Sequence, residues 1–320
     1  MKRLFTTTPA TSLRLFPIHA QAILFMVTFA GALVISIFAL AGSIPGDTTH
    51  ESPTLIKRII SMAPSLTEMV FALGADSLLV GVTRYCKYPP EAESIDKIGG
   101  FLDPNYEVIV EAQPDLVLLL KEHDKPKEMF AKLEIATVTV DHQSVDGIIA
   151  SFGVIGKKLG ATKRSDSLVA VITNQIRKFK IAVYSLEKPT TLICIGHSPD
   201  SGAIKNLYVA GDERFYSEMI ALAGGRNALT EGEGIKFPIL SAESVSKINP
   251  EVIIDIFPDI DGSGLDTAFV LSQWRSLPGV SAIENKRVYP LKGNYLVIPG
   301  PRFVQIIRKF AKALHPDAEF

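Results

Sequence analysis

One phrase occurs twice in this sequence. Residues 101–114 read FLDPNYEVIVEAQP and residues 237–250 read FPILSAESVSKINP. Each copy has Phe first, Glu six positions later and Pro seven positions after that, at an offset of 237 − 101 = 136 residues. In each copy a short helix is expected to end at the proline, and an acid and an apolar strand follow. The repeat predicts two similar halves.

A second match supports the repeat. EMVFALG at Glu68 and EMIALAG at Glu218 precede the two phrases at an offset of 218 − 68 = 150 residues. Between the halves, Thr162 to Tyr184 has an apolar stripe at helical spacing and no Pro or Gly. At 1.5 Å per residue this stretch would be about 34 Å long. It is either an ordinary amphipathic helix or a rod that joins two lobes.

Strands and helices alternate in both halves. Apolar runs such as LVGV, LVLLL, TVTV, TTLICIG and VIIDIF predict strands, and amphipathic segments lie between them. Such alternation implies parallel sheets covered by helices. Ser65 and Glu68 have the spacing of a capping box at the start of a helix. The expected fold is α/β, with two similar lobes that have central parallel sheets and are joined by a long backbone helix.

The N-terminal segment indicates export. Residues 22–42 carry no charge, basic residues precede them, and no acid occurs before Asp47. This pattern is typical of a secretory signal, but the run is also long enough to remain as a membrane anchor. Either way the rest of the chain is expected in the periplasm or outside the cytoplasm. The expected segments are a signal or anchor (1–42), a linker (43–55), an N-terminal lobe (56–160), a linking helix (161–185) and a C-terminal lobe (186–320).

Charge and motifs disfavour two classes of function. Beyond residue 41 there are 33 − 3 = 30 basic and 34 acidic residues, a formal charge of −4, so we expect no nucleic-acid partner. The sequence has no G-x-S-x-G, G-x-G-x-x-G or P-loop motif, and His197 and Ser198 are adjacent rather than arranged as a triad. Hydrolysis is therefore a remote alternative, and we expect neither an enzyme nor a catalytic cofactor.

Two lobes leave a cleft, and the residues that follow the strands are candidates for its walls. Ligands of open parallel sheets bind beyond the carboxyl ends of the strands. Three histidines follow predicted strands, and Phe101 and Phe237 precede the two repeated helices. Because imidazole is a common metal ligand, the histidines could contact a ligand or hold a metal. These residues are His123, His142 and His197.

Several segments carry a resemblance to a known family. They read RIISMAPSLTEMVFALGA, YCKYPPEA, PDLV, YVAGDERFYSEMIALAGGRNAL and PGPRF, and they span about residues 56–318. The chain resembles the periplasmic binding proteins that deliver cobalamin, iron siderophores or haem to ABC importers, and it is most similar to the cobalamin-binding branch. The resemblance implies two rigid class III lobes, a long linking helix, little hinge motion and a permease dimer as partner.

The resemblance also suggests roles for single residues. Glu107 and Glu243 match the family's two docking glutamates, one on each lobe, which pair with arginines of the permease. The alternative is that each only complements the dipole of its helix. Phe101, Phe237 and Tyr85 match positions that hold aromatic residues against the ligand, although core packing is the usual role of Phe.

The chain departs from the cobalamin-binding branch before its last helix. An acid and an arginine of that branch fall on Asn294 and Ile298 here, and Tyr295 is an alternative contact. Arg302 matches a family arginine that could equally be structural. The resemblance favours cobalamin or another corrinoid as ligand, then a ferric siderophore. The alternatives are haem or a metal ion held by His123, His142 or His197.

Overall fold

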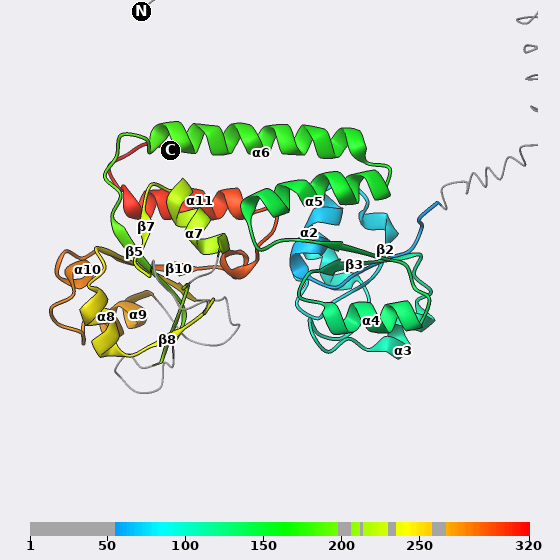
Figure 1. Ribbon diagram of the computed structural model, residues 1–320, viewed down its shortest axis with the longest axis horizontal. Helices are drawn as coiled ribbons and strands as arrows, with labels where there is room; N and C mark the ends of the chain where they lie inside the picture. Colours follow the sequence, from blue (N-terminus) through cyan, green and yellow to red (C-terminus); the bar gives the residue numbers. More distant parts are fainter. Residues whose placement is uncertain (1–54, 198–205, 212–213, 230–234, 258–266) are drawn as a thin grey trace, which may run out of the picture. The chain divides into compact units, whose positions relative to one another are not determined.

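Two sheets with helices on both faces form two lobes, and one long helix spans them (Figure 1). The computed structural model describes residues 55–197, 206–211, 214–229, 235–257 and 267–320. The predicted signal or anchor, almost all of the linker and Ser198 lie outside these residues. Within the described ranges, no helix combines the length and apolarity needed to cross a membrane.

The N-terminal lobe is built on a parallel sheet with the strand order β2-β1-β3-β4. All five residues of β3 are buried, as expected for a strand covered on both faces. In Figure 1, α2 and α5 lie on one side of this sheet and α3 and α4 on the other. The elements are β1 (Ile59–Ser61), α2 (Pro64–Ala72), β2 (Leu79–Val82), α3 (Tyr106–Glu111), β3 (Leu116–Leu120), α4 (Asp124–Lys132), β4 (Thr137–Val140) and α5 (Val145–Lys158), with 3-10 helices at Asp76–Leu78 and Pro90–Ser94.

The C-terminal lobe has a mixed sheet with the order β10-β9-β5-β6-β8, and β7 pairs with β5. Strands β10, β9 and β5 are parallel, whereas β6 is antiparallel to both β5 and β8. The elements are β5 (Thr190–Gly196), β6 (Leu207–Val209), α7 (Arg214–Leu222), β7 (Arg226–Asn227), β8 (Ile239–Leu240), α8 (Ala242–Ile248), β9 (Val252–Phe257), α9 (Thr267–Trp274), α10 (Ser281–Glu284), β10 (Val288–Lys292), a 3-10 helix at Asn294–Val297 and α11 (Phe303–Leu314).

The long helix α6 (Thr162–Ala182) connects the two lobes. It packs mainly against α5 of the first lobe and also contacts α7 and α11 of the second. Its buried side chains include Ile172, Ile176 and Phe179, which belong to the stripe seen in the sequence. The predicted α/β fold of two lobes joined by a long backbone helix is thereby confirmed.

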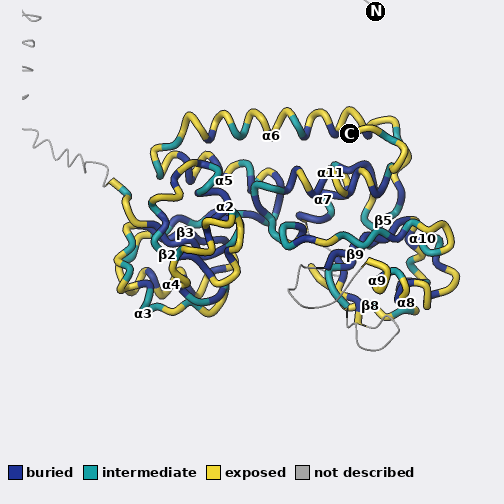
Figure 2. The backbone as a smooth tube through the Cα atoms, turned by 180° about the vertical axis from the view of Figure 1, so that it is seen from behind, coloured by how far each residue is buried: buried dark blue, intermediate teal, exposed yellow. Residues whose placement is uncertain are grey.

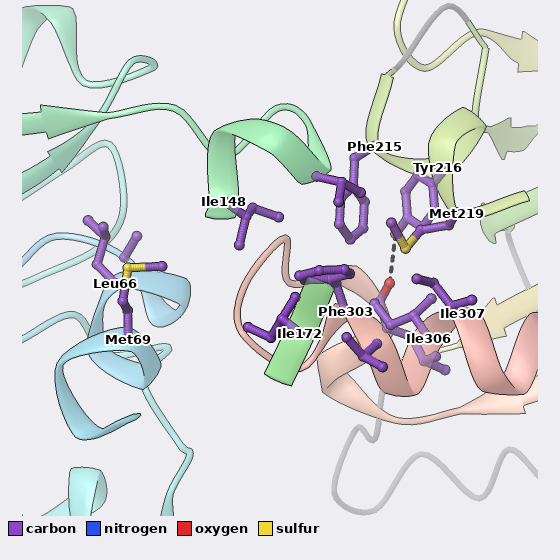
Figure 3. Close-up of a cluster of buried hydrophobic side chains, with 14 of the residues drawn as sticks. Leu66, Met69, Ile148, Ile172, Phe215, Tyr216, Met219, Phe303, Ile306 and Ile307 are labelled. Carbon is purple, nitrogen blue, oxygen red and sulfur yellow. Dashed lines mark hydrogen bonds between the residues drawn. The ribbon is translucent and has the colours of Figure 1, made fainter. Parts of the chain in front are cut away.

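The largest hydrophobic cluster runs through both lobes. It includes Leu66 of α2, Ile148 of α5, Ile172 of α6, Phe215 of α7 and Phe303 of α11, of which Figure 3 shows a part. Buried residues likewise continue from one lobe to the other along these helices (Figure 2). Apolar surface costs about 25 cal/mol per Å² to expose, so this shared core resists separation of the lobes.

Asp115 and Glu251, the acids that follow the two copies of the repeated phrase, have a structural role that the sequence did not indicate. Asp115 accepts backbone hydrogen bonds from Lys57 (2.7 Å) and Arg58 (2.9 Å), which lead into β1. Glu251 accepts one from Thr190 at the start of β5 (2.7 Å). These bonds lower the pKa of both carboxyl groups. Each half therefore uses its acid to fix the entry of the neighbouring strand.

One local prediction is wrong. Helix α2 begins at Pro64 with Ala63 as N-cap, and no side chain caps it, so Ser65 and Glu68 do not form a capping box. Ser65 instead lies 2.9 Å from a nitrogen of His142, and Glu68 pairs with Arg302. Tertiary partners have replaced the local cap that the sequence spacing suggested.

Candidate functional site

A cleft with two adjacent chambers is lined by residues of both lobes. The chambers have volumes of about 820 and 460 Å³. They share four lining residues, Pro64, Tyr85, Val297 and Ile298, and therefore lie next to each other. We call the smaller one the apolar chamber and the larger one the polar chamber.

Phe101 and Phe237 line the same apolar chamber, one from each lobe. Both occupy the first position of the repeated phrase, before α3 and α8 respectively. Leu120, the last residue of β3, lies in the same wall, as expected for a site at the carboxyl ends of strands. The remaining lining residues are Ala63, Pro64, Ser65, Tyr85, Glu122, His142, Gln143, Lys236, Val297, Ile298 and Pro299.

His123 does not line either chamber, contrary to the expectation from its position after β3. Its side chain turns inward because its Nδ1 accepts the backbone N–H of Leu120 (2.9 Å). The ring lies against Phe101, with 4.4 Å between ring centroids. Burial lowers the pKa of His123. A neutral ring whose Nδ1 accepts carries its proton on Nε2. His123 thus packs against Phe101, which lines the apolar chamber, and does not line the chamber itself.

His142 and His197 have different surroundings. His142 lines the apolar chamber, and its burial lowers its pKa from 6.5 to about 4, so it is neutral at pH 7. His197 lines neither chamber, because its Nε2 lies 3.0 Å from the buried carboxylate of Asp255, which also accepts from Trp274 (2.7 Å). The structure does not bring the three histidines together as a metal site. Among the described residues, no group of three or more His, Cys, Asp or Glu could hold a metal.

A buried ion pair forms one wall of the polar chamber. The guanidinium of Arg302 donates to both oxygens of Glu68, at 2.8 and 2.5 Å. It also lies 3.9 Å from the ring centroid of Tyr88 and 5.2 Å from that of Tyr295. Burial raises the pKa of Glu68, and Arg302 partly offsets this effect.

Tyr85 and Tyr295 are predicted contacts that line the polar chamber, and several further lining residues were not predicted from the sequence. Lys87 and Tyr88 belong to the quoted segment YCKYPPEA, so the signal was present but gave no direction for these side chains. The full lining consists of Pro64, Glu68, Tyr85, Lys87, Tyr88, Lys292, Gly293, Asn294, Tyr295, Val297, Ile298 and Arg302.

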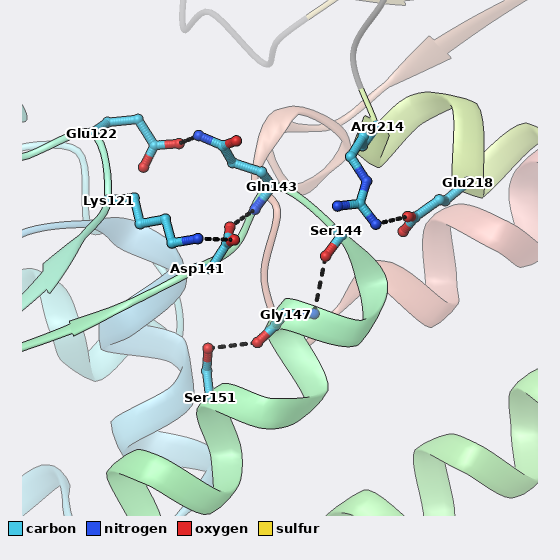
Figure 4. Close-up of polar contacts among 9 residues, drawn as sticks. All are labelled: Lys121, Glu122, Asp141, Gln143, Ser144, Gly147, Ser151, Arg214 and Glu218. Carbon is cyan, nitrogen blue, oxygen red and sulfur yellow. Dashed lines mark hydrogen bonds and ion pairs between the residues drawn. The ribbon is translucent and has the colours of Figure 1, made fainter.

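Paired polar groups border the cleft at the end of β4 (Figure 4). Gln143 donates to Glu122 (2.7 Å), and both line the apolar chamber. Lys121 donates to Asp141 (2.7 Å) beside them. These pairs leave the chamber's aromatic and aliphatic side chains as its main contact surface.

Glu107 and Glu243 lie outside both chambers. Each is exposed in the first turn of its helix, α3 or α8, and these helices lie on the side of their lobes away from α6 (Figures 1 and 2). Glu243 forms an ion pair with Lys247 one turn later (2.9 Å). The two glutamates therefore stand on separate lobes and do not face each other as a hydrolytic pair across the cleft.

Comparison with known proteins agrees with this architecture. The chain is 27% identical to an uncharacterized ABC transporter substrate-binding lipoprotein, YvrC, of Bacillus subtilis over 280 residues, covering 85% of each chain. It is 27% identical to the vitamin B12-binding protein of Vibrio cholerae over 274 residues, covering 80% of this chain and 88% of the relative.

Its fold also matches a crystal structure of a periplasmic haem-binding protein from Pseudomonas aeruginosa. The TM-score is 0.70 at 21% identity, covering 83% of this chain and 95% of the other. The family model described as periplasmic binding protein matches residues 59–295. The chain therefore belongs to the periplasmic binding protein family.

Proposed function

We propose that this chain is an extracytoplasmic solute-binding protein that holds a metal chelate in its interlobe cleft and delivers it to an ABC importer. The observation that carries the proposal is the meeting of Phe101 and Phe237 in one chamber. Equivalent repeat positions thus supply an aromatic ring from each lobe. Apolar wall residues contributed by both lobes suit a broad, flat ligand that enters between the lobes.

Exposed aromatic rings at the cleft support binding of a large ligand. Phe237 is 42% exposed and Tyr85 is 54% exposed, although both line the apolar chamber. Exposed apolar surface of this kind is stabilised when a ligand covers it. A preformed site loses little conformational entropy on binding, and the shared core of the two lobes supplies that rigidity.

The ligand we favour is cobalamin or another corrinoid, followed by a ferric siderophore. The vitamin B12-binding relative supports the first choice. Haem is the alternative, supported by the structural likeness to a haem-binding protein and by the apolar walls. His142 is the histidine placed to touch such a ligand, since it lines the chamber and is held neutral.

Delivery of the ligand to the importer would use the exposed first turns of α3 and α8, one on each lobe, which we call the lobe tips. Glu107 and Glu243 are exposed at equivalent helix positions, so a permease dimer could meet one carboxylate from each lobe. Exposed charges of this kind steer encounter and fix register rather than add stability. The segments at 56–160, 161–185 and 186–320 would act as lobe, linking helix and lobe, and residues 1–42 as a signal or retained anchor.

A titration of three chelates tests this function. The full chain, purified in a mild detergent because of its apolar N-terminal run, is titrated with cyanocobalamin, haemin and ferric ferrichrome. Binding is followed by ligand absorbance and by the fluorescence of Trp274, the one tryptophan of the sequence. We expect one chelate to bind with 1:1 stoichiometry and a Kd below about 1 µM. Failure of all three to bind would contradict the proposal.

A further inference from the structure

We infer that one side of the long helix α6 is a contact surface for the anionic phospholipids of a membrane. This inference goes beyond the proposed function, because it concerns a surface outside the cleft and needs no bound chelate. It is carried by exposed basic and apolar side chains that share one stripe on the C-terminal half of α6 and the turn that follows it.

Four side chains form this stripe, which we call the basic face. Arg177, Lys180, Ile181 and Tyr184 are spaced three and four residues apart, so they lie on one side of the helix. All four are exposed, Ile181 to 68% and Tyr184 to 86%. The other side of the same turns is buried, where Phe179 belongs to the core shared by the lobes. The basic face is therefore turned away from the core and open to a partner.

The sequences of α6 and its neighbour α11 are basic as a whole. Helix α6 has five basic residues and one acidic residue, Asp166, near its other end, and α11 has three basic residues and no acidic one. The two helices contact each other, and the basic residues of α11 are exposed. Lys178 and Arg308 line a small pocket together with Glu319, so we leave them out of the basic face.

Cations interleaved with apolar side chains fit a lipid surface. Anionic headgroups attract Lys and Arg, while apolar and aromatic side chains enter the boundary between headgroups and acyl chains, where Tyr is enriched. A free anion would engage Arg177 and Lys180 and leave Ile181 and Tyr184 in water. A bilayer receives both kinds of side chain at once, which is why we assign the basic face to lipid.

The position of the basic face allows such contact in a tethered chain. Residues 22–42 are the predicted signal or anchor, and residues 43–54 would span at most about 40 Å. Helix α6 has 21 residues and is about 32 Å long, so a retained anchor would let either side of the molecule reach the membrane. The lobe tips lie on the side away from α6 (Figure 1). Contact of the basic face with lipid and docking of the tips to a permease therefore exclude each other.

Short-range quenching tests the contact in the full chain, reconstituted into vesicles. A nitrobenzoxadiazole dye is placed at Thr173→Cys on the exposed side of α6 or at Ala131→Cys on α4, and a lipid with a nitroxide on its headgroup quenches nearby dye. Cys86 and Cys194 are buried, so the introduced thiol is the one that reacts. With about 30% phosphatidylglycerol at low salt, we expect at least about threefold stronger quenching at position 173 than at position 131. Pure phosphatidylcholine, or about 0.5 M salt, should remove the difference.

Variants locate the effect. Arg177→Gln with Lys180→Gln should bring the quenching at position 173 in anionic vesicles to within about twofold of its value in neutral vesicles. The matched control, Lys125→Gln with Lys132→Gln, removes two exposed lysines of α4 and should leave the quenching unchanged. All four positions are exposed, so urea denaturation should give both variants the midpoint of the unmodified chain.

Three outcomes would overturn the inference. They are equal quenching at the two dye positions in anionic vesicles, a difference that persists at high salt, and a difference that persists without Arg177 and Lys180. Dimers seen by light scattering, together with no lipid-dependent quenching, would assign the face to a second copy of the chain instead. The chelate titrations test the cleft separately, so failure here leaves the proposed function standing.

Discussion

Glu68 and Glu218 occupy equivalent positions in the matching stretches EMVFALG and EMIALAG, and each binds a group from the other lobe. Glu68 of α2 accepts two hydrogen bonds from Arg302, which directly precedes α11. Glu218 of α7 accepts the backbone N–H of Val145 at the start of α5 (2.6 Å). In each half, the glutamate at this repeat position therefore accepts hydrogen bonds from the other half.

These contacts add to two other connections between the lobes, the helix α6 and the shared apolar core. A hinge motion large enough to close the cleft would have to break these partly buried hydrogen bonds and open packed apolar surface together. The free energy needed is large compared with that of a lobe pair joined only by loops. We therefore expect the cleft to bind its ligand with small changes in lobe orientation.

Removal of Arg302 should destabilise the protein strongly. Arg302→Met leaves the Glu68 carboxylate, whose side chain is 3% exposed, without its partner. The loss of one partner of a buried pair costs about 3–5 kcal/mol of unfolding free energy. Urea denaturation followed by circular dichroism measures it. Arg84→Met, which breaks an exposed pair with Asp103, is the control and should cost about 1 kcal/mol or less. Equal losses for both variants would contradict the role given to Glu68.

His142 should make stability depend on pH. Its pKa is about 4 in the folded chain against 6.5 for an unperturbed histidine, because burial disfavours the charged ring. The unfolded chain therefore takes up the proton first as pH falls, and the stabilisation that is complete above pH 6.5 is lost progressively towards pH 4. This difference corresponds to about 3 kcal/mol.

Unfolding free energies from urea titrations between pH 4 and pH 8 test this dependence. His142→Gln should flatten the decline below pH 6.5 relative to the unmodified chain, because the variant has no titrating group at this position. Other titrating groups contribute to both proteins alike. An identical decline in the two would show that His142 does not titrate as its burial requires.

Loss of either cleft phenylalanine should weaken ligand binding. Phe101→Ala or Phe237→Ala removes an apolar wall of the chamber, and loss of about 1–3 kcal/mol of burial lowers affinity roughly 5- to 150-fold. Isothermal titration with the chelate that binds the unmodified chain measures the change. Phe269→Ala is the matched control, since Phe269 is 40% exposed on α9 and lines neither chamber. Unchanged affinity in both cleft variants would place the ligand elsewhere.

The two lobe-tip glutamates should affect transport and leave ligand binding unchanged. Glu107→Ala with Glu243→Ala is expected to keep the chelate affinity and to lower uptake about tenfold or more in vesicles that contain the cognate permease. Glu111→Ala with Glu284→Ala, which removes one exposed glutamate from each lobe at other positions, is the control and should transport normally. Weaker chelate binding in the first variant, or normal transport by it, would exclude docking as the role of these glutamates.

Features that depend on residues close together in the chain could be predicted from the sequence. Periodic apolar residues and turn-forming residues indicated the strands, the long helix over Thr162–Ala182 and the two repeated helices. The repeat then implied two lobes and placed Phe101 and Phe237 in corresponding positions. Apolar periodicity is a property of a single helix or strand. It can therefore be recognised without knowing which elements pack against that helix or strand.

The directions of the side chains and the partners that they contact depend on tertiary packing and could not be predicted from the sequence. Glu68 finds Arg302 across 234 positions of sequence, which turned an expected capping box into an interlobe ion pair. His123 and His197 follow strands as expected, yet one turns towards Leu120 and the other towards Asp255. A buried polar group must take whichever partner the packed chain brings within hydrogen-bond distance, and local sequence does not contain that partner.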